Sequence, residues 1–391
     1  MAGNLDNGSL VGLTDAGVAL CECLSEGEVA PAEVPEECRE LVGFLGRAGF
    51  FQESHAVLAP DKVYVHVTGN CNFSCVGCYS HSGGVRSAHD LPTEDWQAML
   101  AKLGGAGVRE LVVSGGEPFL RDDLASLVSC AKGSGIGEVV VLTNGSLVTA
   151  ARLLEMAGSL DRLSLSIDRL PDGTRASVRS DLSWERARGV LDAAREAGVA
   201  VSLLATLHAG NAGEVSAYRA VADELGVGIG FSLLSGDVAE LGAFVPTDEQ
   251  LEGLACGEFS ASGAGSLLPR EASARRSCGA GVHELSVAAD GRVFPCHMLH
   301  CDELCMGNLL DDSVASILAG PMGRRFASLG VDEFEGCREC ELRYLCAGGC
   351  RARGYLSGRG LNAKDPYCAL PGTYYGCFRD ALQKRYHGKE G

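Results

Sequence analysis

The segment KVYVHVTGNCNFSCVGCY, residues 62–79, joins an apolar run to a loop that holds three cysteines. Its first seven residues are mostly β-branched or aromatic and predict a buried strand. Cys71, Cys75 and Cys78 follow, with gaps of three and two residues. A structural zinc site would need a fourth ligand, whereas three thiolates can hold an iron–sulfur cluster and leave one iron for another molecule. The spacing alone leaves both kinds of site open, together with a group of inert buried thiols.

Strand-like runs and helical patterns alternate between residues 62 and 234, and the helical patterns end in glycine. The expected strands are 62–68, 110–116, 138–145, 162–168, 200–207 and 228–234. Six such strand–helix units in a row imply a parallel sheet with helices outside it. We therefore predict an α/β fold, in which spacing alone allows either an open sheet or a partial barrel.

Polar segments follow the first four expected strands. The cysteine loop follows the first, and the others end in GGEP (115–118), TNG (143–145) and SID (166–168). The carboxyl ends of parallel strands meet at one edge of a sheet, where ligands bind in parallel α/β folds. We expect the functional site at that edge.

The two ends of the chain differ from this repeating region. Residues 1–56 predict a small helical unit, because their apolar residues recur at a spacing near 3.6. After about residue 270 cysteines dominate, so we expect a tail that folds around metal rather than around a large apolar core. The expected domains are 1–56, 60–245 for the strand–helix core, 246–277 for a linker, and 278–391 for the cysteine-rich domain.

Composition excludes several classes of protein. The net charge of −18 and the lack of a long Lys/Arg cluster argue against nucleic acid as the main partner. No apolar run is long enough for a transmembrane helix, so we expect no membrane partner. The first residues lack the pattern of a secretory signal, and we expect a cytoplasmic protein. In such a compartment, 18 clustered cysteines favour metal binding over disulfides.

The loop CNFSCVGCY (71–79) resembles the signature of the radical S-adenosylmethionine (SAM) enzymes. The resemblance implies a partial (β/α)6 barrel of TIM type. It also implies that Cys71, Cys75 and Cys78 hold a [4Fe–4S] cluster whose fourth iron binds SAM, so that a 5′-deoxyadenosyl radical abstracts hydrogen from a substrate. The SAM contacts implied by matching segments are Tyr79, Gly115, Gly116, Glu117, Asn144, Ser166, Asp168 and Arg179.

Two of these predicted SAM contacts, Tyr79 and Arg179, have an alternative structural role. A carboxylate such as that of Glu117 suits the ammonium group of SAM, and a guanidinium such as that of Arg179 suits its carboxylate and ribose. Core packing remains the alternative for Tyr79, which would otherwise flank adenine. An exposed helical arginine remains the alternative for Arg179.

The second cysteine region resembles the SPASM extension of radical SAM enzymes. It has Cys278, Gly291 and Cys296 at the expected spacing, followed by CRECELRYLCAGGC (337–350). The resemblance implies two auxiliary [4Fe–4S] clusters with crossed connectivity. One would be held by Cys337, Cys340, Cys346 and Cys368, and the other by Cys278, Cys296 and Cys350. The second would keep an open iron or take Cys256, Cys301 or Cys305 as its fourth ligand. A pair of structural zinc ribbons is the alternative.

SPASM proteins mostly act on ribosomally made peptides or on sulfatases. The resemblance therefore implies an enzyme that takes hydrogen from a residue of a precursor peptide to give a crosslink, an epimer or a related product, with auxiliary clusters that assist oxidation or substrate binding. A reductant such as flavodoxin or ferredoxin would be a second partner. Residues 1–56 are similar to the helical part of a PqqD-like peptide-recognition domain, with a generic helical cap on the barrel as the alternative. The spare thiols that could donate hydrogen are Cys256, Cys301, Cys305 and Cys377.

Three other functions remain open on the sequence. A sulfatase maturase would share the cluster layout and oxidise a protein Cys or Ser. A small-molecule enzyme would use the same radical for decarboxylation or dehydrogenation. An electron carrier or metal-stabilised scaffold would produce no 5′-deoxyadenosine from SAM.

Overall fold

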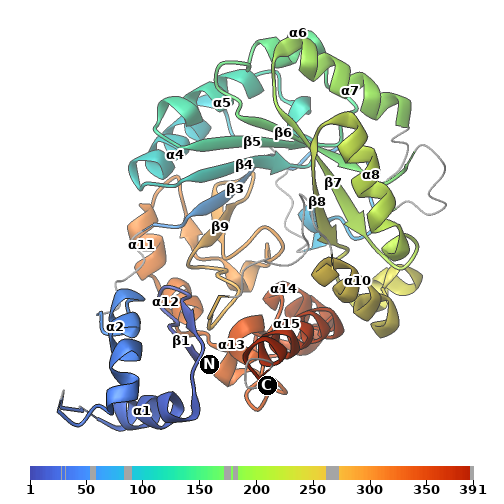
Figure 1. Ribbon diagram of the computed structural model, residues 1–391. Helices are drawn as coiled ribbons and strands as arrows, with labels where there is room; N and C mark the ends of the chain where they lie inside the picture. The colour runs from blue at the N-terminus through green and yellow to red at the C-terminus, as the bar shows by residue number, and fades with distance from the viewer. Residues whose placement is uncertain are drawn as a thin grey trace.

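The computed structural model describes residues 1–27, 29–30, 32–52, 59–82, 90–170, 178, 184–260 and 273–387. At its centre lies a curved nine-stranded sheet in the order β11-β10-β9-β3-β4-β5-β6-β7-β8. Helices α4 to α8 cover the outer face of this sheet, and the cysteine-rich C-terminal region lies on the opposite side (Figure 1). The sheet is open, with β8 and β11 at its edges.

All six strands expected between residues 62 and 234 are present and pair in parallel. They are β3 (Lys62–Thr68), β4 (Glu110–Gly115), β5 (Glu138–Thr143), β6 (Arg162–Ile167), β7 (Val201–Leu207) and β8 (Gly228–Leu233). Strands with almost every side chain buried, such as β4, explain why the sequence reads there as a continuous apolar run. The predicted α/β fold with a partial barrel is confirmed.

The expected helices follow the strands and pack one face on the sheet. They are α4 (Thr93–Gly105), α5 (Leu124–Gly133), α6 (Ala150–Leu154), α7 (Trp184–Ala197) and α8 (Val215–Leu225). Their buried residues, among them Trp96, Leu127 and Val190, form one core with the strands. Short helical turns connect them: α3 (Tyr79–Ser82), η2 (Pro118–Leu120), η3 (Ala212–Glu214), α9 (Val238–Leu241) and η4 (Gly242–Phe244).

The central sheet continues across the domain boundary expected at residue 278. β9 (Glu284–Val287) pairs in parallel with β3, and the short β10 (Arg292–Phe294) and β11 (Gly307–Asn308) add antiparallel strands beyond it. Leu285, Val287 and Val293 are buried in the same core as the barrel. The cysteine-rich region is therefore joined to the barrel through main-chain hydrogen bonds and shared apolar burial.

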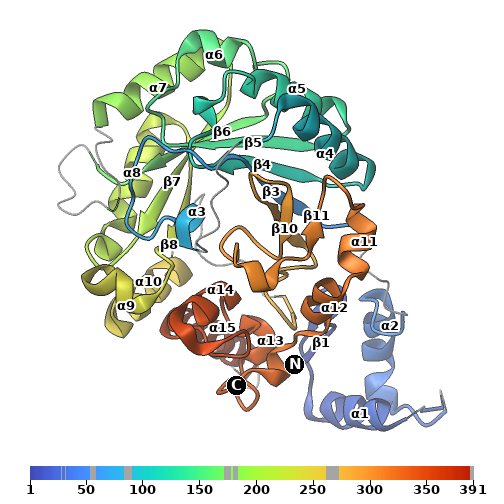
Figure 2. The same ribbon diagram turned by 180° about the vertical axis from the view of Figure 1, so that it is seen from behind.

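The rest of the C-terminal region has an apolar core of its own, which differs from the expected tail folded around metal alone. Phe326, Phe334 and Leu361 are buried there, together with the proposed ligands Cys296 and Cys337. Most of its helices lie below the sheet in the view from behind, and α11 lies beside β11 (Figure 2). They are η5 (Asp302–Leu304), α11 (Val314–Ala319), α12 (Pro321–Ser328), η6 (Val331–Glu333), α13 (Arg343–Cys346), α14 (Arg351–Gly354), η7 (Tyr355–Arg359) and α15 (Ala369–His387).

The segment 246–277, which we expected to be a linker, begins with a long helix. This helix, α10 (Asp248–Ser260), packs along α15 near the C-terminus of the chain. Leu251, Leu254 and Ala255 are buried in the main core. These apolar residues give α10 a face to bury, so the first part of the expected linker is helical.

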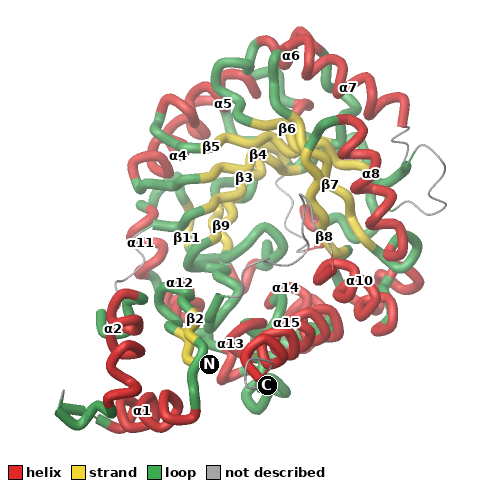
Figure 3. The backbone as a smooth tube through the Cα atoms, in the orientation of Figure 1, coloured by secondary structure: helices red, strands yellow, loops and turns green. Residues whose placement is uncertain are grey.

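The N-terminal residues form a small unit beside the C-terminal region (Figure 3). It contains the hairpin strands β1 (Ala2–Gly3) and β2 (Leu10–Val11), then α1 (Asp15–Glu26), η1 (Glu36–Cys38) and α2 (Arg39–Arg47). The Asn4 side chain donates to Gly49 O at 2.9 Å and ties the hairpin to the end of α2. Ala274 N donates to Gly8 O at 2.9 Å, so the unit is attached to the start of the C-terminal region. It does not cap the barrel, as the helical-cap alternative requires.

Within the described ranges, none of the helices combines the length and apolar character needed to cross a bilayer.

A lysine at the end of α4 links the barrel to the C-terminal region. Lys102 Nζ donates to the main-chain oxygens of Leu309, Leu310 and Asp312 at 2.6, 2.8 and 3.0 Å. These oxygens belong to the turn between β11 and α11. The hydrogen bonds of a half-buried ammonium to three acceptors stabilise a fold more than an exposed ion pair does, because water competes less for each bond.

We expect Lys102→Met to lower the free energy of unfolding by about 2 kcal/mol, because three carbonyls lose a charged donor. Lys132→Met is the matched control at the end of α5. Lys132 pairs with Asp161, where both side chains are about one-third exposed, so its loss should cost less than about 1 kcal/mol. Urea unfolding followed by circular dichroism measures both variants. Equal effects would contradict a special role for Lys102.

Candidate functional site

The cysteine loop that follows β3 is fixed on the end of β4. Gly116 N donates to Thr68 O, and Glu117 N donates to Asn70 O, both at 2.8 Å. A Cβ atom on Gly116 would lie 1.9 Å from Asn70 O, closer than any side chain allows. Glycine is required at this position because the loop backbone and the strand end touch.

Side chains tie the same loop to the ends of β4 and β5. Asn144 Nδ2 donates to Asn72 Oδ1 at 3.0 Å, and Asn72 Nδ2 donates to Ser146 Oγ at 2.8 Å. Ser80, just after the last cysteine of the loop, donates to Gly115 O at 2.6 Å. Asn144, predicted as a SAM contact, therefore also positions Asn72, the residue after Cys71.

A cavity of about 350 Å³ lies at this edge of the sheet. Eight predicted site residues line it, and they are Cys71, Cys75, Cys78, Tyr79, Gly115, Gly116, Asn144 and Ser166. Burial raises the pKa of Cys71, and the neighbouring Cys78 adds to the rise. Three thiols on the wall of a cavity, beside glycine backbone that a ligand can approach closely, fit an iron–sulfur cluster with a small molecule next to it.

Tyr79 lines this cavity and also packs against two histidines. Its ring lies edge-on to His66 and His297, with centroids 5.7 and 5.1 Å apart. Its hydroxyl shares a hydrogen bond with Ser114. The ring is therefore held in place on the cavity wall. There it packs against the two histidines and also faces the space that a ligand would occupy.

Glu117 is the predicted site residue whose orientation differs most from the expectation. Its carboxylate is fully buried and accepts hydrogen bonds from Thr143 Oγ1 at 2.7 Å, Asn144 N at 2.8 Å and Phe119 N at 3.1 Å. Burial raises its pKa, although these hydrogen bonds oppose the rise. The carboxylate does not line the cavity, so it fastens the ends of β4 and β5 together rather than facing an ammonium group there.

Two further predicted SAM contacts are not on the cavity wall. Asp168 is buried just after β6 and does not line the cavity, and its main-chain oxygen accepts from Tyr218 at 2.5 Å. Arg179 lies outside the described residues. From the SID segment, Ser166 is the residue that reaches the cavity.

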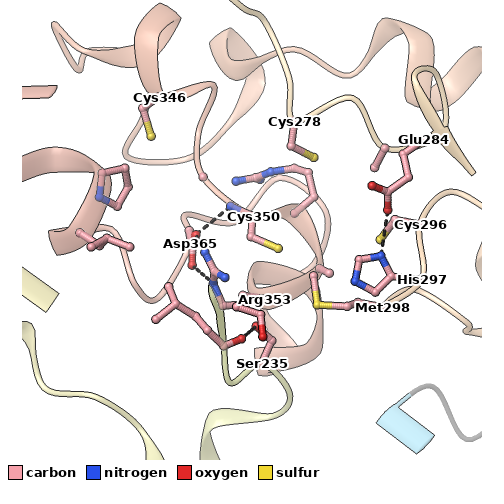
Figure 4. Close-up of a pocket in the computed structure, with 18 of the residues that line it drawn as sticks. Ser235, Cys278, Glu284, Cys296, His297, Met298, Cys346, Cys350, Arg353 and Asp365 are labelled. Carbon is pink, nitrogen blue, oxygen red and sulfur yellow. Dashed lines mark hydrogen bonds and ion pairs between the residues drawn. The ribbon is translucent and has the colours of Figure 1, made fainter. Parts of the chain in front are cut away.

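The C-terminal cysteines fall into two groups by proximity. In the first, burial raises the pKa of Cys296 well above its usual value, and Glu284, Cys350 and Cys278 add to the rise. Cys278 acts on Cys350 in the same way. These three thiols line a second cavity, of about 420 Å³ (Figure 4).

In the second group, burial raises the pKa of Cys346 to about 11, and Cys368 and Cys337 contribute to the rise. Cys340 in turn acts on Cys337 and on Cys368. Thiols within each set that the resemblance implied therefore lie close enough to affect one another, while Cys346 also lines the cavity of the first set, and the two ligand sets stay a prediction. Among the described residues, no three His, Cys, Asp or Glu side chains converge on the position of a single metal ion.

A left-handed turn separates the two groups where they are adjacent in sequence. Ala347, Gly348 and Gly349 have φ values of 56°, 76° and 72°. Such angles are unfavourable for most residues, and glycine adopts them at least cost. The turn sends Cys346 toward Cys368 and Cys350 toward Cys278.

Asp365 holds the first of these groups. Its carboxylate accepts from Cys350 N at 2.7 Å and pairs with Arg353 at 2.6 Å (Figure 4). Burial would raise the pKa of Asp365, but the charge and hydrogen bonds of Arg353 and the backbone lower it overall. Asp365 therefore stays charged and fixes the loop that carries Cys350.

The two cavities share part of their walls. The residues that line both are Phe231, Ser232, Leu233, Ser235, His297 and Met298. His297 accepts or donates a hydrogen bond at 2.9 Å to Glu284, which fixes the orientation of its ring. Sequence reasoning missed these residues, although His297 directly follows Cys296 and Ser235 lies just beyond β8.

The four spare thiols are not on the walls of these cavities. Cys301 is buried in the C-terminal core, and Cys305 Sγ donates to Gly307 O at 3.5 Å. Cys256 lies against Cys377, where α10 packs along α15. None of the four lines either cavity, and their expected roles as fourth ligand or hydrogen donor stay predictions.

We expect Glu117→Gln to destabilise the protein by about 2 to 3 kcal/mol, because one amide group must face a buried donor. The cysteine loop should loosen at the same time and the iron content of its cluster should fall. Glu110→Gln is the control at the start of β4, the strand that leads to Glu117. The pair of Glu110 with Lys62 is partly exposed and should be worth less than about 1 kcal/mol. Urea unfolding and iron analysis measure both. A stable Glu117→Gln protein with full iron content would contradict this assignment.

Two family models match the chain. The radical SAM superfamily matches residues 65–214, and an iron–sulfur cluster-binding domain, SPASM, matches residues 278–341. The first match covers the cysteine loop and the strands up to β7, and the second begins at Cys278.

Relatives of known function match over most of their length. PqqA peptide cyclase of Rhizobium meliloti (strain 1021) is 27% identical over 344 residues, which are 80% of this chain and 88% of the relative. Mycofactocin maturase MftC of Mycobacterium ulcerans (strain Agy99) is 29% identical over 340 residues, which are 81% and 90% of the two chains.

Solved structures share the fold. The crystal structure of Streptococcus suis SuiB bound to its precursor peptide SuiA has a TM-score of 0.65 at 16% identity. It covers 87% of this chain and 81% of that one. The likeness extends over the barrel and the C-terminal region together.

Proposed function

This chain is a radical SAM enzyme with a C-terminal SPASM domain, and we propose that it modifies a ribosomally made precursor peptide. The observation that carries the proposal is likeness over about four-fifths of the chain to PqqA peptide cyclase and to mycofactocin maturase MftC. The likeness includes both the barrel and the cysteine-rich region. The product would be a crosslink, an epimer or a related change in one residue of the peptide.

The cysteine loop would hold the SAM-binding cluster through Cys71, Cys75 and Cys78. With SAM bound, that cluster would supply the one electron that splits SAM into methionine and a hydrogen-abstracting 5′-deoxyadenosyl radical, and the auxiliary clusters would offer a route for electrons. Tyr79, Gly115 and the other residues on the wall of the 350 Å³ cavity would orient SAM. The buried carboxylate of Glu117 would hold the ends of β4 and β5, and with them the cysteine loop, in the positions that SAM binding requires.

The auxiliary clusters would be held by the two groups of C-terminal cysteines. Cys337, Cys340, Cys346 and Cys368 supply four thiols for one cluster. Cys278, Cys296 and Cys350 would supply three for the other, whose fourth position would be an open iron or one of Cys256, Cys301 and Cys305. The substrate would bind beside Ser235 and His297, on the wall that both cavities share.

The N-terminal unit would bind the leader segment of the peptide. It contains a groove of about 940 Å³, whose apolar lining includes Leu24, Val34, Val42, Phe50 and Phe51. The helices around it carry exposed acidic side chains, namely Glu22, Glu26, Glu36, Glu37 and Glu40. An apolar groove among carboxylates fits a peptide segment with apolar anchors and basic neighbours.

The proposal includes a cytoplasmic location and a reductant such as flavodoxin or ferredoxin. Among the described cysteines no disulfide is present, which suits a reducing compartment. A reduced protein of this kind would supply the electron that starts each radical step.

We expect Cys75→Ala to abolish SAM cleavage and Cys340→Ala to spare it. The first change removes one of three thiols in the SAM-binding loop, so 5′-deoxyadenosine should fall by more than about 100-fold. The second removes a thiol of the auxiliary group, so cleavage should continue while peptide product is lost. Chromatography of 5′-deoxyadenosine and mass spectrometry of the peptide measure the two outcomes. SAM cleavage by Cys75→Ala would contradict the assignment of Cys75 as a ligand of the SAM-binding cluster.

The substrate itself is tested by co-expression with a neighbouring reading frame that encodes a short peptide. A mass change in that peptide, dependent on Cys75, supports the proposal. Modification of a sulfatase peptide or of a small molecule, with the short peptide left unchanged, would favour one of the other two enzyme classes. A protein that never yields 5′-deoxyadenosine would be an electron carrier.

We expect Phe51→Glu to weaken precursor binding by about tenfold, which corresponds to about 1.4 kcal/mol. The change places a charge on the wall of the groove, where an apolar anchor would pack. Phe44→Glu is the matched control, because Phe44 is similarly exposed, at 49% against 56%, and does not line the groove. Fluorescence anisotropy with labelled peptide measures both. Equal affinities for the two variants would place the leader elsewhere.

A further inference from the structure

Two cysteines outside the proposed clusters meet where the barrel packs on the C-terminal helix. Cys256 lies on α10 and is exposed, and Cys377 lies on α15 and is half-buried. The two thiols lie close enough to interact, since Cys256 raises the pKa of Cys377. The two helices pack along one another, and both views show them side by side (Figures 1 and 2).

The proposed clusters do not use this pair. Neither thiol lines the two cavities, and neither is among the cysteines that act on one another in the two C-terminal groups. Two interacting thiols on helices that pack along one another are placed where a disulfide can form, since that bond needs two neighbouring side chains. An exposed member also gives a reagent access to the pair.

We propose that Cys256 and Cys377 are a disulfide site that joins the barrel to the C-terminal region in response to oxidation. The bond would connect α10, which follows the last parallel strand, to α15. The first turns of α15 carry Leu370, Pro371 and Tyr375 on the wall of the auxiliary cavity. Oxidation at this site would therefore fix one wall of the proposed active site.

The oxidant would be a low-molecular-weight disulfide such as glutathione disulfide. The Cys256 thiolate attacks one sulfur of the reagent, forms a mixed disulfide and releases one glutathione thiolate. The Cys377 thiolate then attacks the Cys256 sulfur and releases the second glutathione. Two protein thiols are oxidised to one disulfide, and one glutathione disulfide is reduced to two glutathione molecules.

The order of the two steps follows from the surroundings of the thiols. Burial raises the pKa of Cys377, and Cys256 and Asp380 add to the rise. A small disulfide therefore reacts first with the exposed Cys256. The second step is intramolecular, so contact between the thiols gives it a high effective concentration.

The test treats the iron-loaded protein with glutathione disulfide without oxygen, then maps its peptides by mass spectrometry without reduction. We expect a linked pair of peptides containing Cys256 and Cys377, at least about tenfold more abundant than glutathione-capped Cys256. Cys23, an exposed thiol on α1, serves as the internal control and should carry glutathione only. Iron content and absorbance near 400 nm should stay unchanged, because neither thiol belongs to a proposed cluster.

Two variants make the result specific. In Cys377→Ser, glutathione should remain on Cys256, and in Cys256→Ser no linked peptide should form. Amide hydrogen exchange in the first turns of α15 should slow on oxidation in the wild type and stay the same in both variants. Stable glutathione on Cys256 of the wild type, or no reaction at Cys256 while Cys23 is modified, would overturn the proposal.

Discussion

The parallel pairing of β9 with β3 is the constraint on which the site depends. In this register Lys62 lies opposite Glu284 and Val65 lies opposite Val287. β3 leads directly into the cysteine loop, while Cys278 precedes β9 and Cys296 follows β10. One pair of strands therefore positions thiols from two regions that are about 200 residues apart in sequence. The shared wall of the two cavities follows from this pairing, because His297 comes directly after Cys296.

Two buried carboxylates perform the same task in the two halves of the site. Glu117 accepts three hydrogen bonds at the ends of β4 and β5. Asp365 accepts a hydrogen bond from the backbone N–H of Cys350 and pairs with Arg353. A buried carboxylate is costly unless its oxygens are hydrogen-bonded, and both of these are. Each one fixes a loop that carries cysteines. In both places charge serves to hold backbone in position for a bound group.

The N-terminal unit and the catalytic cavities are separate features of the molecule. The unit is attached through its hairpin to the segment before Cys278, and Figure 1 shows it projecting away from strands β4 to β8. In the proposed function a peptide held in its groove would extend past the C-terminal region to the shared cavity wall. The α10–α15 contact lies on that same region, so a disulfide there would act on a wall the peptide must meet.

The sequence by itself determined the parallel strands, the edge at which polar residues gather, and the spacing of the cysteines. These features depend on local rules, because β-branched apolar runs favour buried strands and glycine is needed where backbone angles are left-handed. The sorting of Cys346 from Cys350 was implied by family resemblance, and the turn at Ala347–Gly349 gives its physical cause.

Only the tertiary structure decided the direction of Glu117, the joining of β9 to the barrel, the helix in the expected linker and the contact between Cys256 and Cys377. Each depends on which groups meet across long stretches of chain, and no local preference encodes that. A carboxylate after GG can point toward a ligand or toward three buried donors, and its own neighbours in sequence permit both. Packing selected the donors, because they were otherwise buried without a partner.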